Sequence, residues 1–143
     1  MLESDGPGGA ETVLIRLSEA LRARGHTVFP VGPARGVGWA GARLRELGLE
    51  PDTFTIHRPL DWRCLRGVVQ LLRERRVEVV HSHEFTMAVY GAAAARWLGI
   101  PHIISMHGSQ YVTAKWRLRF ALRLAFQSSA HVVGVSADTT AHL

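Results

Sequence analysis

The stretch Gly6-Pro7-Gly8-Gly9-Ala10-Glu11 is a glycine-rich turn that runs directly into a helical pattern. Gly8 and Gly9 have no Cβ, so a ligand can approach the backbone closely, and the free N–H groups of a helix start point outward. Such a turn can hold a phosphate or a sugar hydroxyl. Glu11 in the first helical turn suits the helix dipole and could accept a hydrogen bond from a ligand or a loop amide. A plain tight turn with a dipole-matched glutamate explains the same residues equally well.

Helical and strand patterns alternate along the rest of the chain. Apolar residues at helical spacing predict helices over 10–24, 42–47, 61–76, 85–98 and 113–127, and a further helix from Ala137. Gly25, Gly48 and Gly99 should end the helices that precede them. Asp61 should cap the helix over 61–76, whose apolar face is formed by Trp62, Leu65, Val69 and Leu72. Short apolar runs predict strands over 26–31, 52–56, 77–81, 102–106 and 131–135, with a loop over 36–41. The strand over 77–81 is rich in valine and should be buried on both faces. Strands and helices that alternate with short joints predict an α/β fold with a parallel sheet and right-handed crossovers.

The start of the chain is short for this fold. A glycine turn of this kind follows a hydrophobic strand at the centre of the sheet. Only Met1-Leu2-Glu3-Ser4 precede it here, and the last predicted helix has only 7 residues from Ala137 to the end of the sequence. We therefore expect a first strand that is clipped, a last helix that is truncated, and a chain that is a fragment of a longer protein.

Composition narrows the class of protein. With 143 residues, 47% of them apolar and 20% charged, the chain is one globular domain. The net charge of +5 favours phosphate-bearing ligands or anionic surfaces, although an arginine-rich genome explains it more simply. Cys64 is the single cysteine, which excludes a disulfide framework, and the acidic start has no signal-peptide pattern. No run is long enough to span a membrane. These features favour a cytoplasmic location.

Two predicted strands end in histidine: Val79-Val80-His81-Ser82-His83 and Ile103-Ile104-Ser105-Met106-His107-Gly108. The carboxyl ends of parallel strands meet at one edge of the sheet, where they face the glycine turn and form a crevice. We expect His83 and His107 to line this crevice, and His81 to pack within the sheet with a hydrogen bond to a neighbouring loop. Side chains alternate along a strand, so His81 and His83 should point to the same side.

Two other classes of site fit this pattern less well. His81, His83 and His107 could be the ligands of a zinc hydrolase, but Glu84 is the only carboxylate nearby in sequence. A dinucleotide site is disfavoured, because Glu11 stands where its fingerprint needs a third glycine.

The predicted helix over 113–127 carries two stripes. Lys115, Arg119 and Arg123 share one stripe, and the residues Trp116, Phe120 and Leu124 share the next. This pattern is typical of a basic amphipathic face on an anionic membrane. It is also typical of a crossover helix whose arginines face water, which is the commoner case.

The ordered set of motifs resembles the N-terminal domain of family 4 glycosyltransferases over nearly the whole chain. The matching segments are Gly8–Glu11 before an amphipathic helix, Leu21–Val28, Val79–His83, Leu98–Pro101 followed by Ser105–Ser109, and Val133–Ser136. The glycine motif alone is weak evidence, whereas the whole set in this order is specific.

This resemblance implies one Rossmann-like, doubly wound half of a retaining GT-B transferase. In such enzymes the N-terminal half largely binds the acceptor, such as a glycan, lipid or small molecule, and a C-terminal half absent here holds the nucleotide-sugar donor. Residues 1–143 would thus be an N-terminal domain incomplete at both ends. The chain alone should be inactive, and an inactive binding module of the same fold is the alternative.

The resemblance also assigns roles to residues. His107 would contact the donor sugar near the reacting carbon as the catalytic residue, and Gly8 and Gly9 would contact donor phosphate or acceptor. Further substrate-binding candidates at the same edge are Glu11, His83, Glu84, Gly108, Ser109 and Ser136. The reaction needs no metal and no cofactor. The enzyme would work in the cytoplasm, where the segment Thr113–Gln127 could contact the inner face of an anionic membrane.

Overall fold

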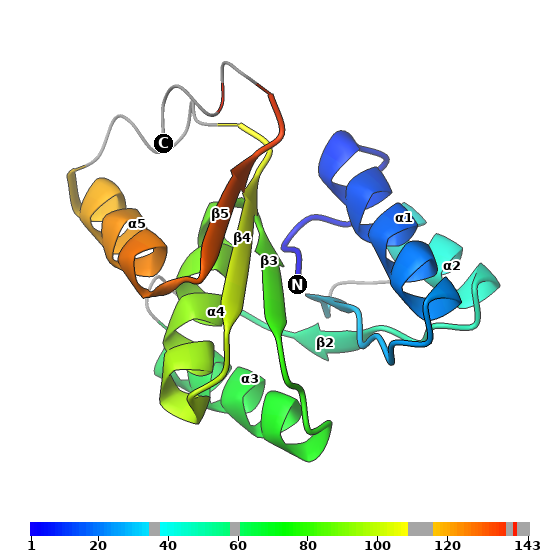
Figure 1. The fold of residues 1–143 in the computed structure, drawn as a ribbon, viewed down its shortest axis with the longest axis horizontal. Coiled ribbons are helices and arrows are strands. Elements are labelled where there is room, and N and C mark those ends of the chain that lie inside the picture. Colours follow the sequence, from blue (N-terminus) through cyan, green and yellow to red (C-terminus); the bar gives the residue numbers. More distant parts are fainter. Residues whose placement is uncertain (35–37, 58–60, 109–115, 137–138, 140–143) are drawn as a thin grey trace.

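The computed structural model describes residues 1–34, 38–57, 61–108, 116–136 and 139. Helices and strands alternate along this part of the chain, as expected from the sequence (Figure 1). In chain order they are α1 (Gly9–Ala23), β1 (Val31–Pro33), α2 (Trp39–Glu46), β2 (Asp52–Phe54), α3 (Trp62–Glu74), β3 (Val80–His83), α4 (Glu84–Leu98), β4 (His102–Met106), α5 (Trp116–Ser128) and β5 (His131–Gly134). None of the described helices is both long and apolar enough to cross a bilayer.

All described strand pairs are parallel, which confirms the predicted α/β class. One group has the order β1-β2, with Val31 opposite Asp52. The other has the order β3-β4-β5, with His81 opposite Ile103 and Ser105 opposite Val133. Each strand of the second group is separated from the next by one helix, α4 or α5, which is the expected crossover pattern.

Met1 and Leu2 lie between the two groups of strands. The Met1 amine donates to the His81 carbonyl at 2.7 Å, and the His83 N–H donates to the Met1 carbonyl at 2.9 Å. This is the bond pattern of a parallel ladder. On the other side the Leu2 N–H donates to the Val31 carbonyl at 3.0 Å. In a parallel ladder the next hydrogen bond would run from the N–H of residue 33 to the Leu2 carbonyl. This residue is Pro33, which has no N–H, so that bond is not formed. The two residues therefore act as the central strand that the glycine turn requires.

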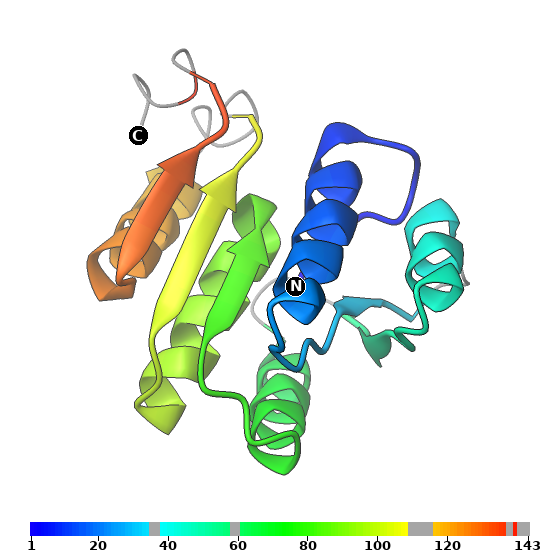
Figure 2. The ribbon, with the colours of Figure 1, turned by 45° about the vertical axis from the view of Figure 1, so that its right-hand side comes forward.

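The side chains of these two residues confirm this strand-like geometry. Met1 packs into a core cluster with Val80, Met87 and residues of α3. Leu2 packs into a different cluster, which is formed by α1 and α2. Alternation of side chains between opposite faces is the property of a strand. Helices α1 and α2 accordingly cover one face of the sheet, and α3, α4 and α5 cover the other (Figures 1 and 2).

Helix ends follow the predicted signals. Gly25, Gly48 and Gly99 have φ values of +84°, +72° and +69°, the left-handed conformation that ends helices and favours glycine. The carboxylate of Asp61 caps α3 by accepting the N–H groups of Arg63 at 2.9 Å and Cys64 at 3.3 Å.

Two predicted strands were placed wrongly. The strand predicted over 26–31 is Val31–Pro33, and the strand predicted over 77–81 is Val80–His83. In both cases the first and last residues of the strand depend on where the neighbouring strand begins and ends. The first residue of β4 is His102, opposite Val80, and the turn before it leaves residues 77–79 without a ladder partner. Val79 is consequently 50% exposed, so the expected burial on both faces is wrong at that residue.

Trp62 was expected on the buried face of α3, and this expectation was wrong. Its side chain is 47% exposed and lies against Trp97, with ring centroids 5.4 Å apart. The buried face consists instead of Cys64, Val68, Val69 and Leu72.

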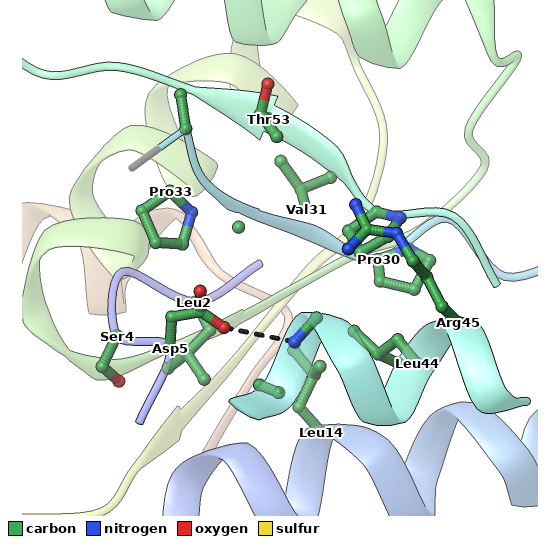
Figure 3. Close-up of a pocket in the computed structure, with 15 residues that line it drawn as sticks. Leu2, Ser4, Asp5, Leu14, Pro30, Val31, Pro33, Leu44, Arg45 and Thr53 are labelled. Atoms are coloured by element: carbon green, nitrogen blue, oxygen red, sulfur yellow. Dashed lines mark hydrogen bonds between the residues drawn. The ribbon is translucent and has the colours of Figure 1, made fainter. Parts of the chain in front are cut away.

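A pocket of about 180 Å³ lies between α2 and β1 (Figure 3). Its lining is mainly apolar and includes Leu2, Val31, Pro33 and Leu44, with Asp5 beside them. None of the histidines at the strand ends lines it.

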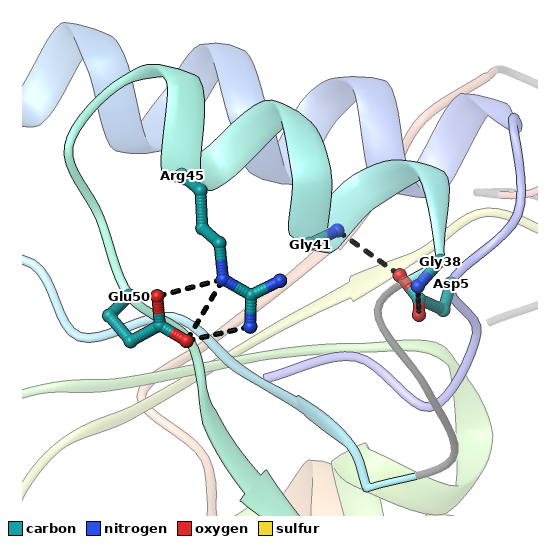
Figure 4. Close-up of polar contacts among 5 residues, drawn as sticks. All are labelled: Asp5, Gly38, Gly41, Arg45 and Glu50. Atoms are coloured by element: carbon teal, nitrogen blue, oxygen red, sulfur yellow. Dashed lines mark hydrogen bonds and ion pairs between the residues drawn. The ribbon is translucent and has the colours of Figure 1, made fainter.

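Asp5 explains why α2 begins at Trp39, three residues before the predicted Ala42. Its carboxylate accepts the N–H groups of Gly38 and Gly41, and its carbonyl accepts that of Ala40 (Figure 4). The cap comes from a residue 33 positions away in sequence, so no local pattern could show it. Arg45 of the same helix forms an exposed ion pair with Glu50, which follows the helix, at 2.6 Å (Figure 4). Residues 113–115, 137–138 and 140–143 of the other predicted helices lie outside the described residues.

Gly91 allows α4 to approach the sheet closely, and this gives a stability prediction. A Cβ at this position would overlap Ser82 Oγ and lie 2.8 Å from His102 Nε2. We expect Gly91→Ala to lower the free energy of unfolding by about 1–3 kcal/mol through overpacking. Gly67→Ala in α3 is the matched control, since nothing lies within 4 Å of its added Cβ.

The control should leave stability unchanged or raise it by about 0.5–1 kcal/mol, because alanine favours helix more than glycine. Urea unfolding of the two variants and the parent measures both effects. Equal stability of the two variants would show that α4 does not pack against Ser82 as closely as described.

Candidate functional site

The edge formed by the carboxyl ends of β3 and β4 brings two of the predicted site residues into contact. His83 ends β3, and His107 follows the last residue of β4. His83 Nδ1 and His107 Nε2 lie 3.0 Å apart and share a hydrogen bond, with ring centroids 5.3 Å apart. His83 is almost completely buried, whereas His107 is half-buried. His107 therefore presents the accessible part of the pair.

His81 supports this pair from within the sheet. Its ring stacks on that of His83 with centroids 4.5 Å apart and an interplanar angle of 21°, so the two side chains point to the same side as predicted. His81 Nε2 bonds Ser105 Oγ at 2.8 Å. The expected packing role is confirmed, but the partner lies on the adjacent strand β4 and not on a loop.

The histidines of this edge are neutral at physiological pH. Burial lowers the pKa of His83 to about 2 and that of His81 to about 4, and it also lowers the pKa of His107. The pKa of His107 is lowered overall, because the effect of burial is larger than the opposing effect of the negative charge on Glu11. In a neutral imidazole one nitrogen donates and the other accepts, so one proton lies between His83 and His107. This fixes the orientation of the His107 ring.

Glu11 connects the glycine turn to the histidine pair. It lies in the first turn of α1 and is 5% exposed. A Cβ added at Gly8 would overlap its Oε2 atom, so the carboxylate lies directly against the backbone of the turn. Its charge acts on both His107 and Glu84. The structure thus brings Gly8, Glu11, Glu84 and His107 to one region.

Glu84 has an unusual backbone conformation. It directly follows His83, begins α4 and has a φ of +66°, a region that non-glycine residues seldom adopt. Its carboxylate accepts a hydrogen bond from the backbone of His107, while burial, the larger effect, raises its pKa. Backbone strain of this kind costs on the order of 1–3 kcal/mol and is concentrated at functional sites. Glu84 therefore remains a candidate for substrate binding.

The start of α1 is open to a ligand at Gly9, whereas the Glu11 carboxylate covers one side of Gly8. Gly8 is the N-cap of α1 and offers no capping side chain. Nothing lies within 4 Å of a Cβ built on Gly9, so the space beside it is open. Helix N-termini of this form bind anions through their N–H groups and dipole.

The remaining predicted residues lie at the same edge or outside the described part. Gly108 is exposed and follows His107, and Ser109 lies outside the described residues. Ser136 is exposed, follows β5, and its hydroxyl accepts the N–H of Thr139 at 3.1 Å. Its contact with a substrate stays a prediction.

The geometry gives no support to a zinc site of His81, His83 and His107. Among the described residues, no group of three histidine, cysteine or acidic side chains is arranged to hold a metal ion. The nitrogens of His83 and His107 that face each other are occupied by their mutual hydrogen bond.

Sequence reasoning missed a second polar cluster, which lies on the face of β3 and β4 that α4 covers. His102 begins β4 and is buried, with Nε2 2.9 Å from Ser82 Oγ and Nδ1 2.7 Å from Ser129 Oγ. Burial lowers its pKa to about 4. Both ring nitrogens are satisfied, so this cluster ties β3, β4 and the end of α5 together. A histidine inside an apolar strand was the signal available in the sequence.

Comparisons with known proteins agree with this architecture. The family model of Glycosyltransferase Family 4 matches residues 7–143. The structure of Anabaena Alr3699/HepE in complex with UDP is 23% identical, with a TM-score of 0.76 over 98% of this chain and 38% of that one. Acinetobacter baumannii MurG is 16% identical, with a TM-score of 0.72 over 97% of this chain and 41% of that one.

A glycosyltransferase from Rickettsia africae ESF-5 is 18% identical, with a TM-score of 0.72 over 99% of this chain and 38% of that one. No curated protein matches the chain in sequence. The chain thus spans about two fifths of the length of these structures and has the Rossmann-like α/β fold of GT-B enzymes.

The buried neutral histidines give a prediction for stability against pH. Their pKa values are lower in the folded chain than the 6.5 of a free imidazole, so unfolding takes up protons below that pH. Burial also lowers the pKa of the Met1 amine to about 5, so the free energy of unfolding should already begin to fall as the pH drops below about 8. It should fall further between pH 6.5 and 4, by about 1.4 kcal/mol per pH unit for each buried histidine.

Urea unfolding at several pH values, with His81→Gln as the test variant, measures this slope. His81→Gln should reduce the fall in the free energy of unfolding per pH unit by the contribution of one buried histidine. His26→Gln, at an exposed residue, should leave this slope unchanged. A stability that is the same at pH 7.5 and pH 5 would contradict the neutral, buried state of these rings.

Proposed function

The chain belongs to glycosyltransferase family 4, and we propose that it is the acceptor-binding half of a retaining transferase with a nucleotide-sugar donor. The fold and the family support a transferase. The HepE structures, which hold UDP or UDP-glucose, support a donor of this chemical class. Because the chain spans 38–41% of its structural relatives, we assign most of the donor binding to a second domain outside these 143 residues.

The contact between His83 and His107, beside Glu11 and the glycine turn, carries the proposal. It places a neutral, oriented imidazole and an accessible helix start at the same edge of the sheet. In open α/β sheets this edge is where ligands bind. No other described region combines buried histidines, a carboxylate and a glycine-rich helix start.

The proposed roles follow from the charges that develop during sugar transfer. The sugar ring gains positive charge, and the departing phosphate gains negative charge. The N–H groups at Gly8 and Gly9 would stabilise the phosphate, as would the dipole of α1. His107 would contact the donor sugar through the ring edge that His83 does not occupy, and its neutral state avoids repulsion with the developing positive charge. Catalysis would thus rest on positioning and electrostatic stabilisation.

Glu11 and Glu84 would serve the acceptor and the shape of the site. Glu11 is close enough to the glycine turn to accept a hydrogen bond from an acceptor hydroxyl. Glu84 accepts a hydrogen bond from the backbone of His107 and so helps to hold this residue in place. Gly108, Ser109 and Ser136 are proposed to complete the substrate contacts. His83 was predicted to bind substrate as well, but its side chain is buried, so we assign it the role of orienting His107. The proposed reaction requires no cofactor of the protein's own.

We place the reaction in the cytoplasm. The single cysteine, Cys64, is free and buried, and burial raises the pKa of its thiol to about 11. A thiol of this kind is inert and forms no structural disulfide, which suits a reducing compartment.

The isolated chain should transfer no sugar, because the proposed donor-binding domain is not part of it. Incubation with UDP-glucose, and with lipid and glycan acceptors, should release no UDP above the background of buffer alone. A coupled assay for UDP measures this. Turnover by the 143-residue chain would show that it holds a complete active site and would contradict the division of roles.

In the whole enzyme, His107→Ala should lower kcat by about 10²–10³-fold, the effect of removing one electrostatic contact to the reacting centre. The thermal unfolding midpoint should change little, since the ring is half-buried at the sheet edge. His131→Ala, at an exposed residue that begins β5, is the matched control and should keep full activity. Unchanged kinetics of His107→Ala would remove this residue from the site, and an enzyme inactive in every form would favour a binding module.

A further inference from the structure

Helix α5 has two apolar faces, and only one of them is covered. Leu122 and Ala125 are buried against α4 and β4, and Leu118 and Phe126 pack beside them. This set accounts for the attachment of the helix to the sheet. Figure 1 shows α5 at the outer end of the helical layer, with α4 as its neighbour.

The second apolar face is directed to solvent. Trp116, Phe120 and Leu124 follow one another at i, i+4 and i+8, and their side chains are 73%, 58% and 50% exposed. We call these three residues the outer stripe. Trp116 is the most exposed large apolar side chain of the described residues. Single exposed apolar residues are common, but a continuous row on one helix face marks an interaction site.

Arginines lie on both sides of the outer stripe. At 100° per residue, Arg119 and Arg123 fall on one side of it and Arg117 on the other. All three are exposed, and α5 contains no acidic residue. Arg117 lies over the Trp116 ring, 5.4 Å from its centroid. An apolar stripe between arginines, with tryptophan at one end, is the pattern of a helix that lies in the interface of an anionic bilayer.

We propose that the outer face of α5 binds anionic membrane surfaces, with the outer stripe inserted between lipid headgroups and the arginines paired with lipid phosphates. The charge of the arginines favours an anionic lipid surface over a second copy of this chain. Self-association through this face would bring the three arginines of two copies close together, which is unfavourable. An anionic lipid surface satisfies both the apolar stripe and the arginines.

The position of the stripe has a consequence for the enzyme. Trp116 begins α5, at the end of the helix that lies toward the carboxyl edge of the sheet, where His107 stands (Figure 1). Membrane binding would therefore hold the candidate site close to the bilayer, which suits a lipid-linked acceptor. This consequence rests on the proposed function, whereas membrane binding itself does not.

Sedimentation with vesicles tests the proposal on the full chain. Vesicles of phosphatidylcholine alone are compared with vesicles that contain one third phosphatidylglycerol, at low and at physiological salt. We expect binding to the anionic vesicles only, and weaker binding as salt is raised. Equal binding to both kinds of vesicle, or no binding to either, would overturn the proposal.

Two double variants separate the contributions. Arg119→Gln with Arg123→Gln should weaken partitioning into anionic vesicles roughly thirty-fold. Phe120→Ser with Leu124→Ser should weaken it about tenfold or more. Arg63→Gln with Arg73→Gln removes the same charge from exposed residues of α3 and serves as the control that should bind like the parent. All these residues are exposed, so unfolding midpoints close to that of the parent are expected and verify the fold.

A control that weakens binding as much as the α5 variants would show a general charge effect and overturn the assignment to α5. Concentration-dependent dimers that disappear in the Phe120→Ser and Leu124→Ser variant, without vesicle binding by the parent, would identify the face as a self-association surface. An interaction with an acidic protein in place of vesicles would likewise overturn the proposal. Loss of vesicle binding with full sugar transfer in the whole enzyme would separate this surface from the proposed active site.

Discussion

The backbone hydrogen bonds of Met1 and Leu2 join the two groups of strands, and the rest of the structure depends on them. Met1 bonds on both sides of Ser82 in β3, and Leu2 bonds Val31 in β1. With its side chains directed to opposite faces, this dipeptide contributes to both core layers. Because the glycine turn follows within a few residues, the same bonds bring the start of α1 to the edge where β3 and β4 end.

The chemistry of the candidate site follows from this placement. Burial between the strands keeps His81 and His83 neutral, and their contacts orient His107 at the carboxyl edge of the sheet. Glu11 belongs to α1, on the opposite face of the sheet, and its negative charge acts on the His107 ring. A strained Glu84 links β3 to α4. The site is thus rigid on the β3–β4 side, and its glycine backbone is open on the α1 side.

Local signals in the sequence were sufficient for most of the fold and for the histidine edge. The helix stops at Gly25 and Gly99 and the cap at Asp61 depend on residues close in sequence, and all three were predicted correctly. The start of α2 was not, because its cap, Asp5, lies far away in the chain. The bounds of β1 and β3 were wrong for the same reason, since a strand ends where its partner ends.

The exposed face of α5 marks another limit of sequence reasoning. Trp116, Phe120 and Leu124 fit a helical core stripe as well as Leu118, Leu122 and Ala125 do, and only the packing against α4 shows which set is covered. In the same way, the pairing of His83 with His107 needs the register of β3 and β4, which places His83 opposite Ser105. The spacing of residues shows which of them share a face of a helix or strand. Which face is buried depends on the neighbouring element.

Hydrogen exchange of single backbone amides tests most directly whether Met1 and Leu2 form the central strand. The amides of Leu2 and His83 donate to Val31 and Met1 across the two junctions. We predict that both exchange as slowly as the amide of Ile104 at the centre of β4, through opening of the whole sheet. Exchange of either amide at the rate of an exposed loop would show that the two groups of strands are not joined, and the shared site would then have no structural basis.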